Sequence, residues 1–197
     1  YLDTKTFQLP IYENFEIIIV DNCSTDDTVK IIEEIKNKNN RRKIKIILNE
    51  ENKGCYYSKN IGLKNIDPGT KYICFHDSDD ISKCCRIEKQ IYFMKQNKLL
   101  ISTCLGYNNN NNIKMPMITL MISKNVFETI GYFNLRRYGS DEEYYYRIFI
   151  SFVKDFDWNN STLYDESSNY GFFKKYKNYQ ILKEVLYTIY SQSNSLT

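Results

Sequence analysis

The first hundred residues alternate between short apolar runs, typical of β-strands, and longer segments in which apolar residues recur at helical spacing. The run FEIIIV at 15–20 is nearly continuous and rich in β-branched residues, which predicts a parallel strand covered on both faces. The segment STDDTVKIIEEIKNK at 24–38 follows, with Ser24 and Thr25 as N-cap candidates and its apolar residues along one helical face. The chain therefore opens with a strand and then a helix.

The same alternation repeats along the chain. It predicts strands at KIKIIL (43–48), KYICFH (71–76) and LLISTC (99–104), and helices at GCYYSKNIGLKNI (54–66) and CRIEKQIYFMKQN (85–97). Strands and helices that alternate at this spacing predict an α/β fold, a three-layer α/β/α sandwich around a mostly parallel sheet.

After residue 105 the pattern loosens. The asparagine run at 108–112 predicts a flexible surface loop, because asparagine turns easily and buries little. The remaining elements are predicted as a strand at MPMITLMIS (115–123) and helices at KNVFETIG (124–131), DEEYYYRIFISFV (141–153) and NYQILKEVLYTIY (178–190). In the last of these, Leu182, Val185, Leu186 and Ile189 share one helical face. This half is interpreted as an elaboration of the first, within one domain.

Composition excludes several classes of function. The 197 residues, 42% hydrophobic and 26% charged, suit one globular domain, and a net charge of +3 with scattered Lys and Arg argues against nucleic-acid partners. No apolar run reaches the roughly 18 residues of a membrane-spanning helix, and YLDTKTFQLP lacks the features of a signal peptide. Six cysteines without a C-x-x-C pair, beside one histidine, favour reduced thiols over a zinc site. We expect a soluble, cytoplasmic chain.

Acidic residues gather where predicted strands end and where a predicted helix begins. Asp21 follows the first strand, HDSDD at 76–80 follows the third, and Asp141 opens the helix at 141–153. Taken singly, each cluster is explained by helix capping and by the helix dipole. Taken together, the first two point to one crevice, because ligands of open parallel sheets bind outside the carboxyl ends of the strands.

The spacing of Asp77 and Asp79 suits a divalent cation. Two carboxylates separated by one residue offer hard oxygen ligands, and Mg²⁺ and Mn²⁺ are the cations that such ligands most naturally bind. Because Mg²⁺ usually keeps water and binds through one or two carboxylates plus substrate phosphates, the pattern suggests a cation that holds a diphosphate.

Several blocks occur in the order and spacing of a known family. FEIIIVDNCSTDDT, NKGCYYSKNIGLKN, KYICFHDSDDIS, VFETIGYFN and GSDEEYYYRI together resemble the family 2 glycosyltransferases of the GT-A fold. The resemblance implies one Rossmann-like nucleotide-binding domain over 1–197, with a nucleotide-sugar-binding half at 1–105 and an acceptor-side half at 113–197. Relatives begin with a further apolar strand that this sequence lacks, so an N-terminally truncated domain with unpaired strand edges is expected.

The resemblance also implies a role for individual residues. Asp21 and Asn22 would lie beside the nucleobase, and Lys59 would stand near the donor, where relatives more often have arginine. Asp77 would face ribose and metal, next to Ser78 on the donor side, and Asp79 would be the principal metal ligand.

The catalytic base would be Asp141, which matches the family's acidic motif although Ser140 replaces the usual glutamate. Gln192 stands where relatives often carry a histidine near the metal. The implied reaction is metal-dependent, inverting transfer of a sugar from a nucleotide diphosphate donor, a UDP-sugar favoured, to a hydroxyl of a glycan, a lipid-linked glycan or a protein. Two alternatives stay open: a nucleotide-sugar-binding domain with impaired catalysis, and a sugar-phosphate nucleotidyltransferase, whose glycine-rich phosphate loop is not visible near the first strand.

Overall fold

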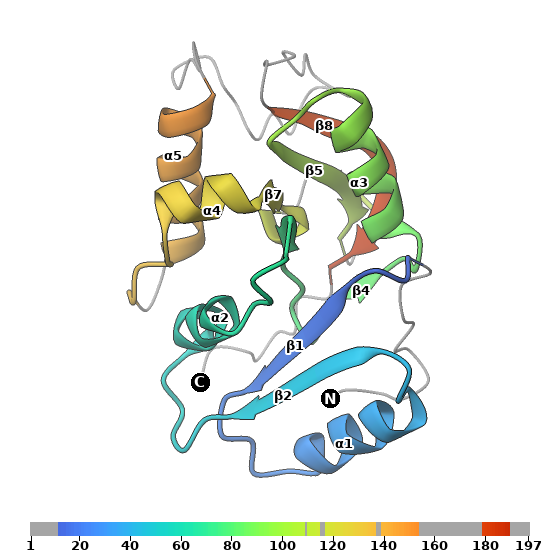
Figure 1. Ribbon diagram of the computed structural model, residues 1–197, viewed down its shortest axis with the longest axis vertical. Coiled ribbons are helices and arrows are strands. Elements are labelled where there is room, and N and C mark those ends of the chain that lie inside the picture. The colour runs from blue at the N-terminus through green and yellow to red at the C-terminus, as the bar shows by residue number, and fades with distance from the viewer. Residues whose placement is uncertain (1–11, 109, 115–116, 137–138, 154–178, 190–197) are drawn as a thin grey trace.

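The computed structural model describes residues 12–108, 110–114, 117–136, 139–153 and 179–189. Its N-terminal part is a small unit of strand β1 (Glu16–Asp21), helix α1 (Thr28–Lys38) and strand β2 (Lys43–Leu48), drawn in blue in Figure 1. The two strands are parallel and in step, from the pair Glu16 and Lys43 to the pair Asp21 and Leu48. We call these three elements the β1–β2 unit.

The described residues after β2 build a six-stranded sheet. Its strands are β3 (Tyr72–Cys74), β4 (Ile81–Ser82), β5 (Ile101–Tyr107), β6 (Ile113–Lys114), β7 (Met121–Ser123) and β8 (Tyr179–Thr188). The order is β3–β7–β5–β8–β4, with β6 paired to β5. The helices that accompany it are α2 (Cys55–Lys64), α3 (Arg86–Gln96), α4 (Lys124–Ile130) and α5 (Ser140–Phe152), with a 3-10 turn at Met117–Thr119.

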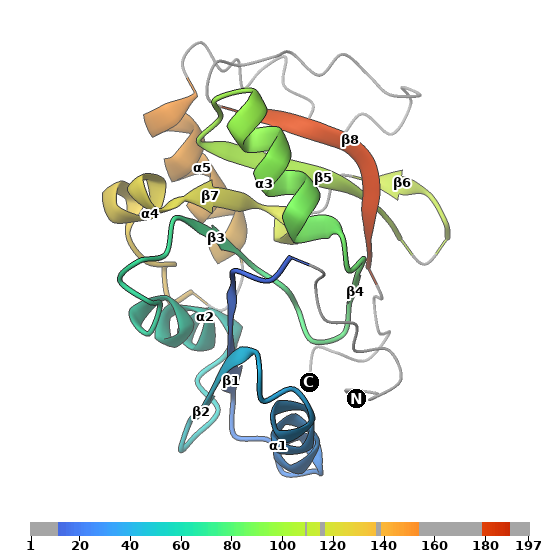
Figure 2. The same ribbon diagram turned by 45° about the vertical axis from the view of Figure 1, so that its right-hand side comes forward.

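Helices cover both faces of this sheet. Figure 2 shows α3 in front of β5 and β8, with α5 on the opposite face. The larger apolar core lies between the sheet and α4 and α5, where Ile101, Ile122, Val126 and Ile148 have no exposed surface. The smaller core lies under α3 and centres on Met94. Three layers therefore form around β7, β5 and β8.

The α/β fold is confirmed, but the strands are not mostly parallel. β1 with β2 and β5 with β8 pair in parallel, whereas β3 with β7, β5 with β7, β5 with β6 and β4 with β8 pair antiparallel. The alternation of apolar patterns predicts which segments are strands, and it carries no signal for direction once the connections stop being single crossover helices.

Where the structure describes the chain, the β1–β2 unit and the six-stranded sheet share no strand pairing. Among the described residues, β1 pairs only with β2, and β3 pairs only with β7. Helix α2 makes the closest connection, because it packs alongside β1, where Gly62 lies against Val20 (Figure 1). In the described residues, helix α2 and the connecting loops thus join the β1–β2 unit to the rest of the fold.

The last predicted helix is wrong, because residues 179–188 form strand β8. β8 runs parallel to β5 with register shifts beside Leu105, and these irregularities bury the consecutive residues Leu186 and Tyr187. An irregular strand loses the alternation of a regular one, so its apolar spacing imitates a helix.

Two smaller predictions also need correction. Of the strand predicted at 115–123, residues 117–123 are described, and within them Met117–Thr119 form the 3-10 turn and Met121–Ser123 the strand. Helix α1 begins after Asp27, and Ser24 instead donates to the carboxylate of Asp21. In the asparagine run, predicted as a surface loop, the side-chain oxygen of Asn108 accepts from the backbone N–H groups of Asn110 and Asn112, which are exposed and lie between β5 and β6.

The described helices are too short or too polar to cross a bilayer, since none combines the required length with the required apolar character.

Candidate functional site

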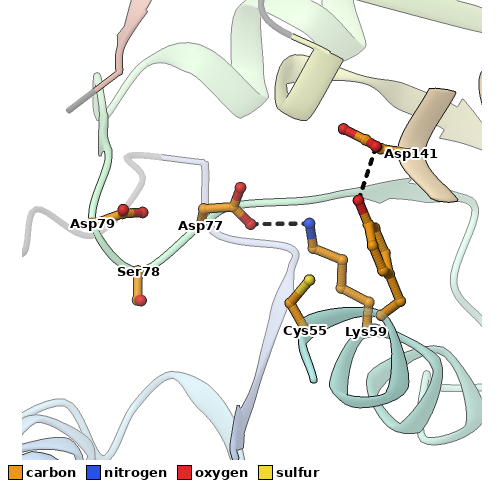
Figure 3. A pocket seen from close by; sticks show the side chains of 7 residues that line it. Cys55, Lys59, Asp77, Ser78, Asp79 and Asp141 are labelled. Atoms are coloured by element: carbon orange, nitrogen blue, oxygen red, sulfur yellow. Dashed lines mark hydrogen bonds and ion pairs between the residues drawn. The ribbon is translucent and has the colours of Figure 1, made fainter. Parts of the chain in front are cut away.

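A pocket of about 410 Å³ opens where three elements meet: the start of α2, the turn after β3 and the start of α5 (Figure 3). Its lining consists of Cys55, Tyr56, Lys59, Asp77, Ser78, Asp79 and Asp141. Five of the seven residues singled out from the sequence are therefore in one pocket. The other two, Asp21 and Asn22, lie outside its lining.

The acidic turn after β3 is held by a short set of bonds. The backbone N–H of Asp80 donates to the carbonyl of Asp77 at 3.2 Å, which leaves Ser78 and Asp79 exposed at the corner. The N–H of Asp77 donates to the Tyr187 hydroxyl oxygen at 3.4 Å, so β8 supports this turn from below. The corner presents carboxylates to the pocket because the backbone, not the side chains, closes the turn.

A buried arginine supports the same turn. Arg86 is 2% exposed, donates to the carbonyl of Phe75 at 3.1 Å and to Gln90 at 2.9 Å, and lies 5.0 Å from the ring centre of Tyr187. The sequence analysis missed this role. The sequence did contain a signal for it. Arg86 stands in the first turn of a predicted helix, where a positive charge is unfavourable with the helix dipole, so such a residue is expected to have another structural role.

Lys59 pairs with the first aspartate of the turn. Its ammonium nitrogen lies 3.0 Å from Oδ1 of Asp77, and the lysine side chain is 19% exposed while the aspartate is 43% exposed. Figure 3 shows the Asp77 carboxylate turned toward Lys59, with Asp79 on its other side. Lys59 stands one helical turn after Cys55, the first residue of α2, and both side chains line the pocket.

Asp141 stands across the pocket from the acidic turn, in the first turn of α5 (Figure 3). Gly139 makes the entry to this helix possible, because its φ of 71° lies in the left-handed region that favours glycine. The hydroxyl of Tyr56 donates to Oδ1 of Asp141 at 2.8 Å. Burial, followed by this hydrogen bond, raises the pKa of Tyr56, so its hydroxyl stays protonated and acts as a donor.

The pocket offers two neighbouring carboxylates as candidate ligands for a metal. Asp77 and Asp79 both line the pocket, and the described part of the chain contains no group of three or more His, Cys, Asp or Glu residues able to hold a metal. Two carboxylates fit Mg²⁺ or Mn²⁺ if water and substrate phosphates complete the coordination. The residues present therefore fit a cation that arrives with its substrate.

Asp21 is the last residue of strand β1 and Asn22 follows it, and both hydrogen-bond to residues of neighbouring loops. Asp21 is 6% exposed and accepts from the backbone N–H of Ser24 at 3.0 Å. The amide oxygen of Asn22 accepts from the N–H of Lys53 at 3.1 Å and from Asn49 at 3.2 Å. These bonds tie the ends of β1 and β2 to the loop that leads into α2. Gln192, the remaining position of interest, lies outside the described residues.

Comparison with known proteins places this geometry in a family. The model of "Glycosyl transferase family 2" matches residues 5–179. The chain belongs to glycosyl transferase family 2. The match includes β1, the acidic turn, α2 and the whole of α5, and so covers every residue that lines the pocket.

Two of the curated relatives match a little under half of the chain. An uncharacterized glycosyltransferase of Haemophilus influenzae is 38% identical over 91 residues, which are 46% of this chain and 35% of the relative. The UDP-Glc:alpha-D-GlcNAc-diphosphoundecaprenol beta-1,3-glucosyltransferase WfaP of Escherichia coli is 44% identical over 91 residues, which are 46% of this chain and 34% of the relative. The matched segment thus spans about a third of each of these proteins.

Solved structures share the fold over nearly the whole chain. S. aureus TarS 1-349 in complex with UDP-GlcNAc has a TM-score of 0.69 at 16% identity, over 92% of this chain and 51% of that one. The mannosyltransferase PcManGT from Pyrobaculum calidifontis, in complex with GDP-Man and Mn²⁺, has a TM-score of 0.64 at 10% identity, over 91% and 49%. At these identities the likeness establishes the GT-A type of fold.

Proposed function

We propose that this chain binds a nucleotide diphosphate sugar at the pocket and transfers the sugar, with inversion, to a hydroxyl group of an acceptor. The observation that carries the proposal is the convergence of Asp77, Asp79, Lys59 and Asp141 from three separate elements. Family membership supports the reaction class, and the pocket offers both a charged donor side and a carboxylate opposite to it.

A UDP-sugar is the favoured donor. TarS structures contain UDP and UDP-GlcNAc, and the Escherichia coli relative is named for a transfer from UDP-Glc. The alternative donor is a GDP-sugar, because the mannosyltransferase PcManGT, which has the same type of fold, is bound to GDP-Man and Mn²⁺. Asp21 and Asn22, at the end of β1, are proposed to lie beside the nucleobase.

On the donor side, the charges of this pocket suit a diphosphate. Asp77 and Asp79 would hold Mn²⁺ or Mg²⁺, which as a Lewis acid stabilises the charge that develops on the leaving diphosphate. Lys59 contributes a positive charge that Asp77 already orients at 3.0 Å. Ser78, exposed at the corner of the turn, offers a hydroxyl to the donor.

On the acceptor side, Asp141 is proposed as the general base. The acceptor oxygen forms a bond to the anomeric carbon, the bond from that carbon to the diphosphate oxygen breaks, and the nucleoside diphosphate leaves with the bonding electrons. The acceptor proton passes to Oδ2 of Asp141, the carboxylate oxygen that does not accept from Tyr56. Because a carboxylate is a much weaker base than an alkoxide, this transfer is favourable only late in the displacement and depends on close positioning.

Donor binding is tested first by calorimetric titration of the chain with UDP, with and without Mn²⁺. We expect metal-dependent binding that is lost in Asp79→Ala and kept in Asp26→Ala, a matched change at an exposed aspartate outside the pocket. Metal-dependent binding that survives Asp79→Ala would contradict the assigned ligand. Titration with GDP distinguishes the two bases.

Turnover is tested by release of UDP from UDP-sugars in the presence of glycan, lipid-linked and protein acceptors. We expect Asp141→Asn to lower kcat by at least about a hundredfold while donor binding persists, since a positioned base contributes roughly 10²–10⁴ in rate. Glu142→Gln, the exposed neighbour outside the pocket, is the control. Donor binding without turnover by the wild type would instead favour a nucleotide-sugar-binding domain.

A further inference from the structure

We propose that Tyr56 is a positioning residue that holds the Asp141 carboxylate for proton abstraction from the acceptor. The inference rests on the proposed function, since it assigns a partner to the base of that reaction. Its starting point is the hydrogen bond from the Tyr56 hydroxyl to Oδ1 of Asp141 at 2.8 Å, which joins two residues 85 positions apart. The bond connects the donor-side helix α2 to the helix that carries the base.

Because of this bond, the two oxygens of the Asp141 carboxylate have different roles in the proposal. Oδ1 accepts from Tyr56. Oδ2 accepts no hydrogen bond from the described residues, so it remains available for the acceptor hydroxyl. Rotation of the carboxylate would break the bond to Tyr56. The hydroxyl therefore selects one orientation of Asp141, and the raised pKa of Tyr56 keeps this hydroxyl a donor.

The ring of Tyr56 is itself held from below. It stacks on Phe133 at 5.8 Å between ring centres, and Phe133 stacks on Tyr144 of α5 at 4.0 Å. Asn60 of α2 donates to the carbonyl of Phe133 and accepts from its N–H, both at 2.8 Å, and is 7% exposed. Tyr144 follows Asp141 by one helical turn. The same stack that fixes the Tyr56 ring also fixes the start of α5.

One turn of α2 thus arranges both sides of the pocket. Tyr56 and Lys59 are three residues apart, so they share a face of the helix. Lys59 pairs with Asp77 on the donor side, Tyr56 bonds Asp141 on the acceptor side, and the Lys59 ammonium lies 5.7 Å from the centre of the Tyr56 ring. Helix α2 thereby relates the donor carboxylate to the base.

The test compares Tyr56→Phe with Tyr57→Phe by steady-state kinetics. The control loses the same hydroxyl from the next residue, whose ring lies under Lys53 and outside the pocket. We expect Tyr56→Phe to lower kcat by about ten- to a hundredfold, as for the loss of a hydrogen bond to a charged group, with the KM for the donor within twofold of the wild type. Tyr57→Phe should change neither value by more than about twofold.

A double-mutant cycle separates positioning from a general structural role. In the background of Asp141→Asn, we expect Tyr56→Phe to have less than about a third of its effect, both on residual turnover and on the urea midpoint of unfolding. Equal effects in both backgrounds, or a Tyr56→Phe enzyme with unchanged kcat, would overturn the inference while leaving the proposed function in place. A wild-type chain that binds UDP but shows no turnover would overturn both.

Discussion

The β1–β2 unit and the six-stranded sheet contain equally apolar strands that are buried to different degrees. In β1, every residue from Glu16 to Val20 is only partly buried, whereas β5 is buried from Ile101 to Gly106. The difference follows from the layers, because α3 covers one face of β5 and the α4 and α5 layer covers the other (Figure 2). Burial of a strand is thus set by what packs on it.

The two regions are also joined to the rest of the molecule in different ways. The β1–β2 unit is connected to the rest through polar contacts, such as that of Glu16 with the N–H of Asp67 and that of Lys45 with the carbonyl of Asn65 at 2.6 Å, and through α2. The six-stranded sheet is held by apolar cores. The proposed base Asp141 belongs to the well-packed region, and the proposed nucleobase contacts Asp21 and Asn22 belong to the other. We therefore expect the donor side to adapt more easily than the acceptor side.

The largest expected effect compares two isoleucines. Ile122→Ala in β7 removes a side chain with no exposed surface from the larger core, and we expect it to lower the free energy of unfolding by about 4 kcal/mol. Ile18→Ala in β1, where the side chain is only partly buried, should cost about 1 kcal/mol. Urea unfolding measures both. Equal costs would contradict the difference in packing.

The next effect concerns the helix that joins the two regions. Asn60→Ala leaves the buried backbone N–H and carbonyl of Phe133 without their partner, and we expect a loss of about 2 kcal/mol in the free energy of unfolding. The matched change Asn65→Ala, at the exposed end of α2, should cost less than about 1 kcal/mol because water can replace its bond to Ile61. Chemical denaturation of both variants provides the comparison, and similar losses would argue against a special role for Asn60.

The free energy of unfolding is expected to depend on pH through Glu16, whose carboxylate accepts from the N–H of Asp67. Burial raises the pKa of Glu16, but the hydrogen bonds from Lys45 and from the N–H of Asp67, with the charges of Lys45 and Lys43, outweigh it and hold the pKa below its ordinary value. The stabilisation is therefore complete above the unfolded-state pKa and is lost as the pH falls through the folded-state pKa. Glu16→Gln should cost about 1 kcal/mol at pH 7 and progressively less as the pH is lowered from about 5.

The control for this experiment is Glu34→Gln, which removes an exposed pair with Lys38 within α1. We expect it to change stability by about 0.3 kcal/mol at most, with little dependence on pH. A constant difference between Glu16→Gln and the wild type from pH 7 to pH 3 would contradict the assigned cause.

The smallest expected effect tests whether the nucleotide reaches both regions. Cys55 lines the pocket, and Cys23 follows Asn22; both are exposed. If the base lies beside Asp21 and Asn22, saturating UDP with Mn²⁺ should slow alkylation of both thiols by about threefold, which peptide mass mapping can follow. Protection of Cys55 alone would confine the nucleotide to the pocket. Buried Cys104, whose pKa burial raises to about 11, should stay unlabelled with or without UDP.

Most elements of the first hundred residues were predictable from sequence. β1, β2, α2 and α3 lie where the apolar patterns place them, since a local pattern of one side-chain period is enough to distinguish a strand from an adjoining helix. β8 was not predictable in this way, because its apolar spacing arises from register shifts against β5, which depend on a partner 80 residues away in the chain. The antiparallel pairing of β3 with β7 was not predictable either, because these strands are also far apart in the sequence.

The sequence by itself determined the α/β class, the family and the acidic residues that meet at the pocket, because each rests on residue types at short, regular spacings. Only the tertiary structure decided that Tyr56 bonds Asp141, that Lys59 pairs with Asp77, and that Arg86 and Tyr187 support the acidic turn. These contacts join side chains from separate elements, and their geometry follows from the packing of helices on a sheet. No local pattern records such packing, since it is a property of the whole folded chain.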